Sequence, residues 1–245
     1  MIDFFSAAAA FLAGLIKTTF GVGAGVFLTP LLSINMDPKT AVALMAPMML
    51  FSDLSTIGLH WKKWDASHVK VLIPGGVIGV LIGSYYLAWA SPSITQVTIG
   101  IVAMAFSALQ IVRQQKSEYF TNLNMKPVHG ALISVFAGAF SAVAHSGGIV
   151  ISIYLITLGM AKHAFVATLI LFLFVGDILK MVLFTKFGVL NSEILIAGII
   201  LTPALFLGSW LGSKLINKLT DKQFILIVNV FIFLSGLFLI IKNYY

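Results

Sequence analysis

Two glycine-rich interruptions of long apolar segments are the places in this sequence best suited to binding a ligand. They span residues 21–25 (GVGAG) and residues 145–148 (HSGG). Glycine lets a helix unwind and lets the backbone come close to a ligand. A helix beginning just after Gly25 or Gly148 would point N–H groups and its positive dipole end into the interruption. Such a helix end is suited to an anion.

Polar side chains beside these interruptions can add to an anion site. Lys17 and His145 supply positive charge or N–H donors, and Thr18 and Ser146 supply hydroxyl groups. Other roles remain open, because Lys17 can extend towards the membrane surface and His145 can be an ordinary buried histidine. Clustered glycines can also serve close helix packing. We expect the glycines of the two interruptions to take part in binding.

Two aspartates lie inside apolar segments, where a carboxylate is costly and commonly marks an ion or proton pathway. They are Asp53 and Asp177, and Lys180 follows Asp177 by three residues. This spacing puts Asp177 and Lys180 on one helix face, so we expect them to form an ion pair. Asp53 has no cation at the same spacing. The aspartates either hold broken backbone through hydrogen bonds from N–H groups, serve proton or ion coupling, or lie at the lipid interface.

The elements that carry these residues are expected to be membrane-spanning helices. Of 245 residues, 60% are apolar and 9% are charged, against about 25% charged in a soluble domain. Spanning a bilayer takes about 20 apolar residues per helix. The apolar runs cover residues 4–33, 40–59, 69–90, 94–112, 128–157, 163–185, 193–216 and 222–241. They are continuous, unlike the alternating strands of a β-barrel, so the sequence predicts an all-α polytopic membrane protein.

The two halves of the chain share features in the same order. The segment PGGVIGVLIGS from Pro74 resembles PALFLGSWLGS from Pro203. Other pairs, about 125 residues apart, are Gly14 and Gly138, Lys39 and Lys162, and Asp53 and Asp177. This order predicts a duplication, with residues 1–120 and 121–245 as two repeats within a single membrane domain.

The first apolar segment of each half is long and broken, so it forms either one tilted span or a hairpin of two short helices. With hairpins, ten basic loop residues fall on one side of the membrane and three on the other; with single spans the division is eight and five. The ten are Lys62, Lys63, Lys70, Arg113, Lys116, Lys126, Lys162, Lys214, Lys218 and Lys222, and the three are Lys39, Lys186 and Lys242. Because basic loops gather in the cytoplasm, hairpins are favoured. Each half then has a hairpin and three transmembrane helices, the repeats are inverted, and both termini are non-cytoplasmic.

The segments GLIKTTFGVGAGVFLTPLL from Gly14 and AGAFSAVAHSGGIVISIYL from Ala137 are each followed by a lysine-containing turn, a long apolar helix, and later a proline with spaced glycines. This paired order resembles the TauE/SafE family of sulfite and organosulfonate exporters over nearly the whole chain. The resemblance implies a transporter in the inner (plasma) membrane that exports a small sulfur-containing anion. The residues that match the family's two glycine breaks, and are implied to bind substrate, are Gly21, Gly23, Gly25, Pro30, His145, Ser146, Gly147 and Gly148.

Three alternatives to a carrier remain. An anion channel can share inverted hairpins, and a structural role in a membrane complex needs no solute flux. An intramembrane aspartyl protease would use Asp53 and Asp177 as two carboxylates that share a proton. However, Phe174 stands where that motif requires glycine, and the duplication already accounts for both aspartates. We therefore expect no enzyme activity.

Composition also bounds the cofactors and partners. The chain has no cysteine, which excludes thiolate metal sites and disulfides, and we expect no cofactor and no metal. The net charge of +7 comes from basic loops and indicates membrane orientation, not nucleic-acid binding. The expected partners are a small anionic substrate and the lipid bilayer, and a homodimer is compatible with the sequence.

Overall fold

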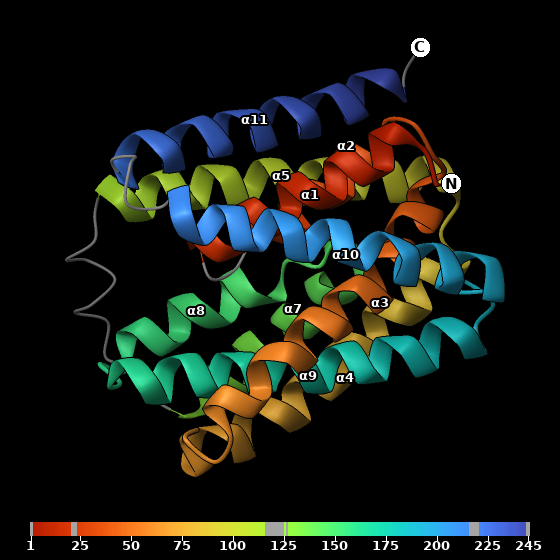
Figure 1. The fold of residues 1–245 in the computed structure, drawn as a ribbon. Coiled ribbons are helices and arrows are strands. Elements are labelled where there is room, and N and C mark those ends of the chain that lie inside the picture. Colours follow the sequence, from red (N-terminus) through yellow and green to blue (C-terminus); the bar gives the residue numbers. More distant parts are fainter. Residues whose placement is uncertain (1, 21–23, 116–124, 126, 216–220, 244–245) are drawn as a thin grey trace.

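Helices make up almost all of the structure, a computed structural model that describes every residue except 1, 21–23, 116–124, 126, 216–220 and 244–245 (Figure 1). The helices are α1 (Phe4–Phe20), α2 (Ala24–Leu32), α3 (Pro38–Ile57), η1 (Gly58–His60), α4 (Ala66–Trp89), α5 (Pro92–Gln115), α7 (Pro127–Ala144), α8 (Gly147–Thr157), α9 (Lys162–Lys186), α10 (Ser192–Leu215) and α11 (Asp221–Lys242). They follow the predicted apolar runs closely, and the described residues contain no strand. The prediction of an all-α protein is confirmed.

Two aspartates set where long helices begin. The Asp37 carboxylate accepts hydrogen bonds from the backbone N–H groups of Lys39 and Thr40, at 2.9 and 3.1 Å. The Asp65 carboxylate accepts from those of Ser67 and His68 in the same way. Each cap satisfies N–H groups that have no acceptor within the helix, and an alanine there costs about 1 kcal/mol. The caps fix the first turns of α3 and α4.

Long apolar helices with apolar outer faces identify a membrane protein. In the described part of the chain, five helices are long and apolar enough to span a bilayer, namely α3 with η1, α4, α5, α9 and α10. Large side chains point outward, such as Trp89 at 75% exposure and Phe136 at 60%. Exposed apolar surface on this scale is foreign to soluble monomers but is suited to lipid, where helices satisfy their own backbone. The chain is a polytopic membrane protein.

The second broken segment is a helical hairpin. Gly147, at the start of α8, lies against Ala137 of α7, and Tyr154, two turns later, lies against Gly130. Contacts that move backwards along α7 as the chain advances along α8 define antiparallel helices. The chain reverses at His145, whose φ of +48° is uncommon for a residue with a side chain. The hairpin predicted here is confirmed, and a single tilted span is not found.

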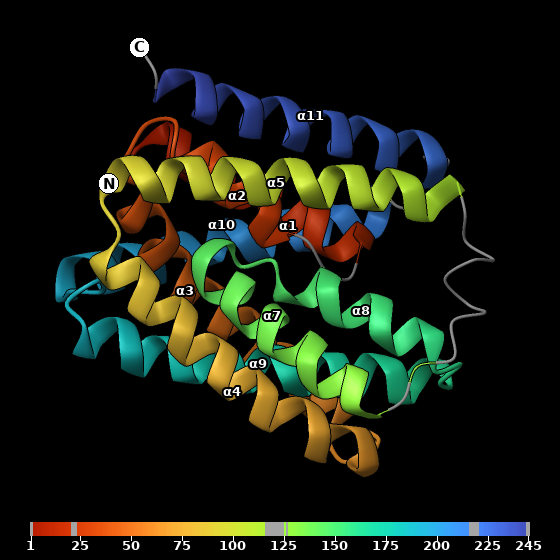
Figure 2. The same cartoon turned by 180° about the vertical axis from the view of Figure 1, so that it is seen from behind.

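The first broken segment has the same plan. Helix α2 packs back against α1, and the turn between them, residues 21–23, lies outside the described residues. Both hairpins reach into the helix bundle, where long helices surround them (Figures 1 and 2). The two broken segments therefore share one architecture.

The hairpin of each half packs against a long helix of the other half. Helix α1 packs along α10, and α7 packs along α4 (Figure 2). Gly208 of α10 lies against the backbone of Phe11, and Gly79 of α4 lies in the same manner against that of Val135. Small residues let helix backbones approach closely in a membrane. The repeated contact agrees with the predicted duplication, and the predicted boundary at residue 120 lies outside the described residues.

The last helices of the two halves, α5 and α11, pack side by side in opposite directions (Figures 1 and 2). The Gln96 amide donates to the Leu239 carbonyl at 3.0 Å, and further along α5 the Ser107 hydroxyl donates to the Asn229 carbonyl at 2.6 Å. At successive contacts the residue numbers increase along α5 and decrease along α11, so the two helices are antiparallel. Antiparallel packing of corresponding helices is what inverted repeats require.

The two ends of the bundle can be identified from contacts between loops. The Lys242 ammonium donates to the Ile34 carbonyl at 2.7 Å, and the Lys39 ammonium donates to the Ala88 carbonyl at 2.9 Å. Both chain termini lie at this end (Figure 1). At the other end, the Asp65 backbone donates to the Thr168 hydroxyl at 3.0 Å. Of the basic residues predicted to be cytoplasmic, Lys62, Lys63, Lys70 and Lys162 lie near the starts of α4 and α9 at that second end, whereas the compartments remain a prediction.

Because α1 packs closely on α10, adding one methyl group at this contact should lower the thermal stability of the protein. A Cβ at Gly208 would overlap the Phe11 carbonyl, which belongs to the backbone and cannot rotate away. Overpacking costs about 1–3 kcal/mol, so Gly208→Ala is expected to lower the Tm of the purified protein by roughly 2–12 °C. Gly58→Ala is the control, because no atom lies within 4 Å of a Cβ there. Equal Tm values for the two variants would contradict this packing.

Candidate functional site

The start of α2 meets the turn of the second hairpin inside the bundle. Gly25, in the first turn of α2, packs against the backbone of His145 so closely that a side chain at position 25 would overlap it. One turn further along α2, the Thr29 hydroxyl lies 3.4 Å from the Ala144 carbonyl oxygen. The two glycine-rich interruptions, far apart in the sequence, are thereby brought together.

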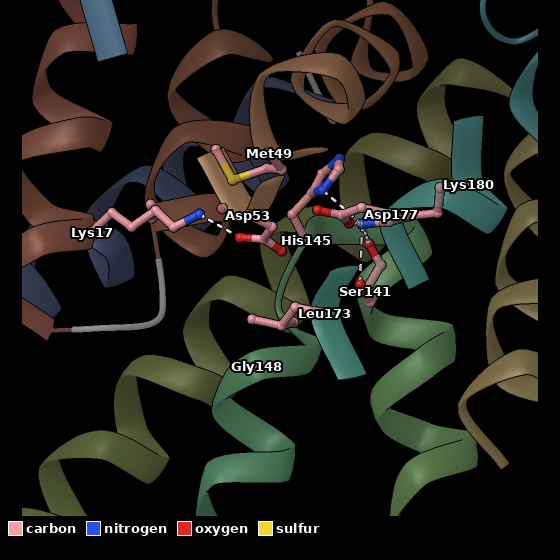
Figure 3. A pocket seen from close by; sticks show the side chains of 11 residues that line it. Lys17, Met49, Asp53, Ser141, His145, Gly148, Leu173, Asp177 and Lys180 are labelled. Carbon is pink, nitrogen blue, oxygen red and sulfur yellow. Dashed lines mark hydrogen bonds and ion pairs between the residues drawn. The ribbon is translucent and has the colours of Figure 1, made fainter. Parts of the chain in front are cut away.

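A small cavity lies at this meeting point and takes its walls from both halves of the chain. Its volume is about 40 Å³, room for about three water molecules. Its lining residues are Lys17, Ala24, Gly25, Met49, Asp53, Ser141, His145, Gly148, Leu173, Asp177 and Lys180 (Figure 3). Four of these side chains are charged, which is unusual inside a membrane protein and indicates a functional site.

Lys17 and Asp53 form the first of two ion pairs in this cavity. The Lys17 ammonium, at the end of α1, lies 2.8 Å from an Asp53 carboxylate oxygen on α3. The Asp53 side chain is 4% exposed and that of Lys17 is 18% exposed. Figure 3 shows Lys17 approaching from the side of the cavity opposite Lys180. The pair is therefore partly open to solvent at its lysine.

Lys180 and Asp177 form the second pair, as their spacing on α9 predicts. The two charged groups lie 2.5 Å apart, and the Lys180 side chain is 1% exposed. The Lys180 ammonium also lies within hydrogen-bonding distance of the Ser141 carbonyl, the Ser141 hydroxyl and Nδ1 of His145, at 3.3, 3.1 and 2.9 Å. An ammonium has three N–H donors, so these four acceptors use its full capacity.

His145 is held by both of its ring nitrogens. Because an ammonium can only donate, Nδ1 accepts from Lys180. Nε2 then carries the proton and donates to the Val42 carbonyl at 3.0 Å. The imidazole is neutral and ties the tip of the second hairpin to α3 of the first half. This is the buried-histidine role that the sequence left open, and a direct bond from His145 to a ligand would require one of these contacts to break.

The two ion pairs lie at positions that the predicted duplication would make equivalent. Asp177 is 124 residues after Asp53 (177 − 53), and Ser141 is 124 residues after Lys17 (141 − 17). The Lys180 ammonium contacts Ser141, so it occupies the place that the Lys17 ammonium has in the first half. Both carboxylates have a lysine at an equivalent position, although the lysine comes from α1 in one half and from α9 in the other.

A large vestibule leads from the Lys17–Asp53 pair towards the end of the bundle that carries η1. Its volume is about 800 Å³, and it reaches from Lys17 and Asp53 to His60 and the exposed Lys162. Between them its walls include Ser152, Ile156 and Phe165, together with Phe206 of α10. The first ion pair thus stands in the wall between the vestibule and the small cavity.

The corresponding region of the first hairpin is closed. In this part of the repeats the pair Lys39 and Lys162 sets an offset of 123 residues (162 − 39), so the counterparts of the vestibule residues Ser152 and Ile156 are Thr29 and Ser33, with exposures of 0% and 2%. Every residue of α2 is buried. The cavity is therefore approached through a vestibule at one end of the bundle and is covered by packed side chains at the other.

The structure brings together most of the predicted site residues. Those that line the cavity are Lys17, Gly25, His145, Gly148, Asp53, Asp177 and Lys180. Gly147 instead packs against Ala137 and Ser141, and Ser146 donates its hydroxyl to the Phe140 carbonyl at 3.1 Å. Pro30 is buried within α2. Thr18 lies in the last turn of α1 with its side chain outside the described part, and Gly21 and Gly23 are outside the described residues.

Close packing, the alternative role of the glycines, is observed at Gly25 and Gly147. Their role in binding remains a prediction. Sequence reasoning missed Met49 and Leu173 among the apolar lining residues. These are 124 positions apart (173 − 49) and precede Asp53 and Asp177 by four residues, so one turn of α3 and of α9 carries both a lining side chain and a carboxylate. The duplication was the signal that could have identified them.

The fold and this site define a polytopic helical membrane protein with paired broken hairpins around a charged internal cavity. The profile of the family described as "Sulfite exporter TauE/SafE" matches residues 6–239. The chain belongs to this family and is thus a membrane transporter of the exporter class. Searches of curated proteins and of solved structures each found no match. The resemblance stated from the sequence is confirmed.

Proposed function

We propose that the protein exports a small sulfur-containing anion, sulfite or an organosulfonate, by alternating access through the cavity between the two hairpins. One observation carries this proposal. The hairpin tips converge on a cavity that holds Lys17, and that cavity adjoins a vestibule of about 800 Å³. The proposed substrate contacts the Lys17 ammonium after passing His60 and Lys162 in the vestibule.

Backbone amides at the start of α8 provide the second part of the proposed anion site. Ser146 occupies the N-cap position of this helix without making a side-chain cap, because its hydroxyl donates to Phe140. The first N–H groups of a helix have no acceptor within it and lie at its positive end. Gly148, in this first turn, lines the cavity. Sulfonate and sulfite oxygens accept such hydrogen bonds, as anions do at other helix N-termini.

The difference between the two ends of the bundle supports alternating access. One end has the vestibule, whereas the counterparts of its lining residues at the other end are packed. Exchange of these two arrangements between inverted repeats would open the opposite side. The antiparallel packing of α5 on α11 supports such inversion. We place the protein in the inner membrane with the vestibule facing the cytoplasm and both termini outside it, following the basic loops.

The ion pairs argue against the protease alternative. An aspartyl protease needs two carboxylates that share a proton, whereas Asp53 and Asp177 each have a lysine partner. A passive channel would need an open path through both ends, and the packed residues of α2 do not favour one. The substrate and the surrounding lipid are the proposed partners, and assembly as a homodimer remains a prediction.

Counterflow in proteoliposomes tests this function. Vesicles loaded with sulfite, thiosulfate, methanesulfonate or acetate are diluted into medium with the same anion in labelled form. We expect labelled sulfite or methanesulfonate to accumulate transiently, with saturable rates, because a carrier exchanges bound anions. Acetate and protein-free vesicles are the controls. Large currents that do not saturate would support a channel, and no exchange of any sulfur anion would contradict the proposal.

A further inference from the structure

The Lys17–Asp53 pair is the one position where a substrate anion arriving from the vestibule meets a charge of each sign. The pair lines both the vestibule and the small cavity. The other ionisable groups around Asp53 are Asp177 and Lys180 of α9 and His145 of the hairpin turn, and across the vestibule His60 and Lys162. Helices α8 and α10 present only uncharged side chains to these cavities.

The small cavity is electrically balanced before substrate binds. Lys17 and Lys180 contribute two positive charges, Asp53 and Asp177 contribute two negative charges, and His145 is neutral. A monovalent anion added beside the intact Lys17–Asp53 pair would give this balanced, largely buried cavity a net negative charge, which is strongly disfavoured. The anion and the Asp53 carboxylate therefore compete for the Lys17 ammonium, which lines both cavities.

Among the described residues that line the small cavity, the displaced Asp53 carboxylate would have no free cation to pair with. Lys180 already has four acceptors within reach, which exhausts its donors. A buried carboxylate without a partner is strongly disfavoured, and the simplest relief is a proton taken from water in the vestibule. Asp177 keeps its ion pair with Lys180. The environment thus distinguishes two aspartates that the duplication makes equivalent.

We propose that Asp53 is the proton-coupling residue, which takes up one proton when substrate replaces it on Lys17, so that anion and proton move in the same direction. This rests on the proposed function of the cavity. In the loading step, the ion pair between Lys17 and Asp53 and one proton become an anion–Lys17 pair and a neutral Asp53 carboxylic acid. On release, the acid loses its proton and the original pair forms again. Both the empty and the loaded cavity are then neutral for a monovalent anion.

The test uses anions that carry no titratable proton near neutral pH, so that any proton movement belongs to the protein. Vesicles containing the full-length protein and a trapped pH dye receive an inward gradient of methanesulfonate or thiosulfate. We expect lumenal acidification that tracks anion uptake, with one proton per methanesulfonate. At equilibrium, an inward proton gradient of one pH unit should concentrate methanesulfonate about tenfold, since one pH unit is a tenfold ratio of proton activity.

Asp53→Asn separates coupling from transport. The amide cannot exchange a proton, so we expect counterflow to continue at an altered rate while acidification and the tenfold accumulation are lost. If this variant does not fold, the wild-type protein still provides a test. Because the loaded and the empty cavity are both neutral, methanesulfonate uptake should be insensitive to a potassium diffusion potential. Anion flux without acidification, driven by that potential, would overturn the coupling and leave the proposed function standing. Proton coupling that persists in Asp53→Asn would also overturn it, and no flux of either anion would overturn both proposals.

Discussion

Replacing Lys17 with methionine is expected to lower the rate of sulfite or sulfonate counterflow by about 100-fold or more. A hydrogen bond to a charged group contributes roughly 1.5–3 kcal/mol, and the upper value corresponds to about a hundredfold change in binding. Methionine keeps the length of the side chain and removes the ammonium. It also leaves Asp53 without its 2.8 Å partner, and that carboxylate would repel an incoming anion. Initial rates in proteoliposomes with matched protein content measure the effect.

Lys39→Met is the matched control for Lys17→Met. It also removes one lysine charge, but the Lys39 ammonium contacts the Ala88 carbonyl at the end of the bundle away from the vestibule. We expect Lys39→Met to keep most of the wild-type rate. The double variant Lys17→Met with Asp53→Asn removes the unpaired carboxylate and should remain inactive. Restored transport in the double variant would mean that Lys17 only neutralises Asp53 and does not bind the anion.

The helices and their hairpins could be predicted because their signals are local. Each apolar run is long enough to span a bilayer, and the caps at Asp37 and Asp65 stand directly before α3 and α4. The spacing of Asp177 and Lys180 likewise required only helical geometry, and the pair is present. Such features depend on residues a few positions apart, where the period of the helix fixes the distance.

The partner of Asp53 could not be predicted in the same way. Lys17 is 36 residues away on another helix, and the two charges meet only because α10 packs against both α1 and α3. The vestibule is even harder to predict from the sequence, because Ser152 lines a cavity whereas its counterpart Thr29 is buried in a packed interior. A duplicated sequence predicts the features that the two halves share. The difference between an open vestibule at one end and packed side chains at the other depends on the conformation and has no signal in the sequence.

Removal of Lys180 is expected to affect stability more than removal of Lys17. Lys180→Met leaves Asp177 buried without a partner, and breaking a buried ion pair in this way costs about 3–5 kcal/mol. For a chain of this length the Tm should fall by roughly 6–20 °C. The Asp53 and Asp177 side chains are equally buried, at 4% exposure, but Asp53 lines the vestibule, from which water can reach the carboxylate left behind by Lys17→Met. Thermal unfolding of the purified variants compares the two.

A second substitution identifies the cause of this loss. Lys180→Met with Asp177→Leu removes both charges, and replacing a buried ion pair by apolar groups is often neutral, so most of the lost Tm should return. His145 and Ser141 lose their donor in both variants, and their share of the effect should therefore remain in the double variant. A double variant as unstable as Lys180→Met would assign the stability to the hairpin contacts alone. The Lys180 ammonium would then act as a support for the turn at His145, and the charge of Asp177 would have to be stabilised by another group.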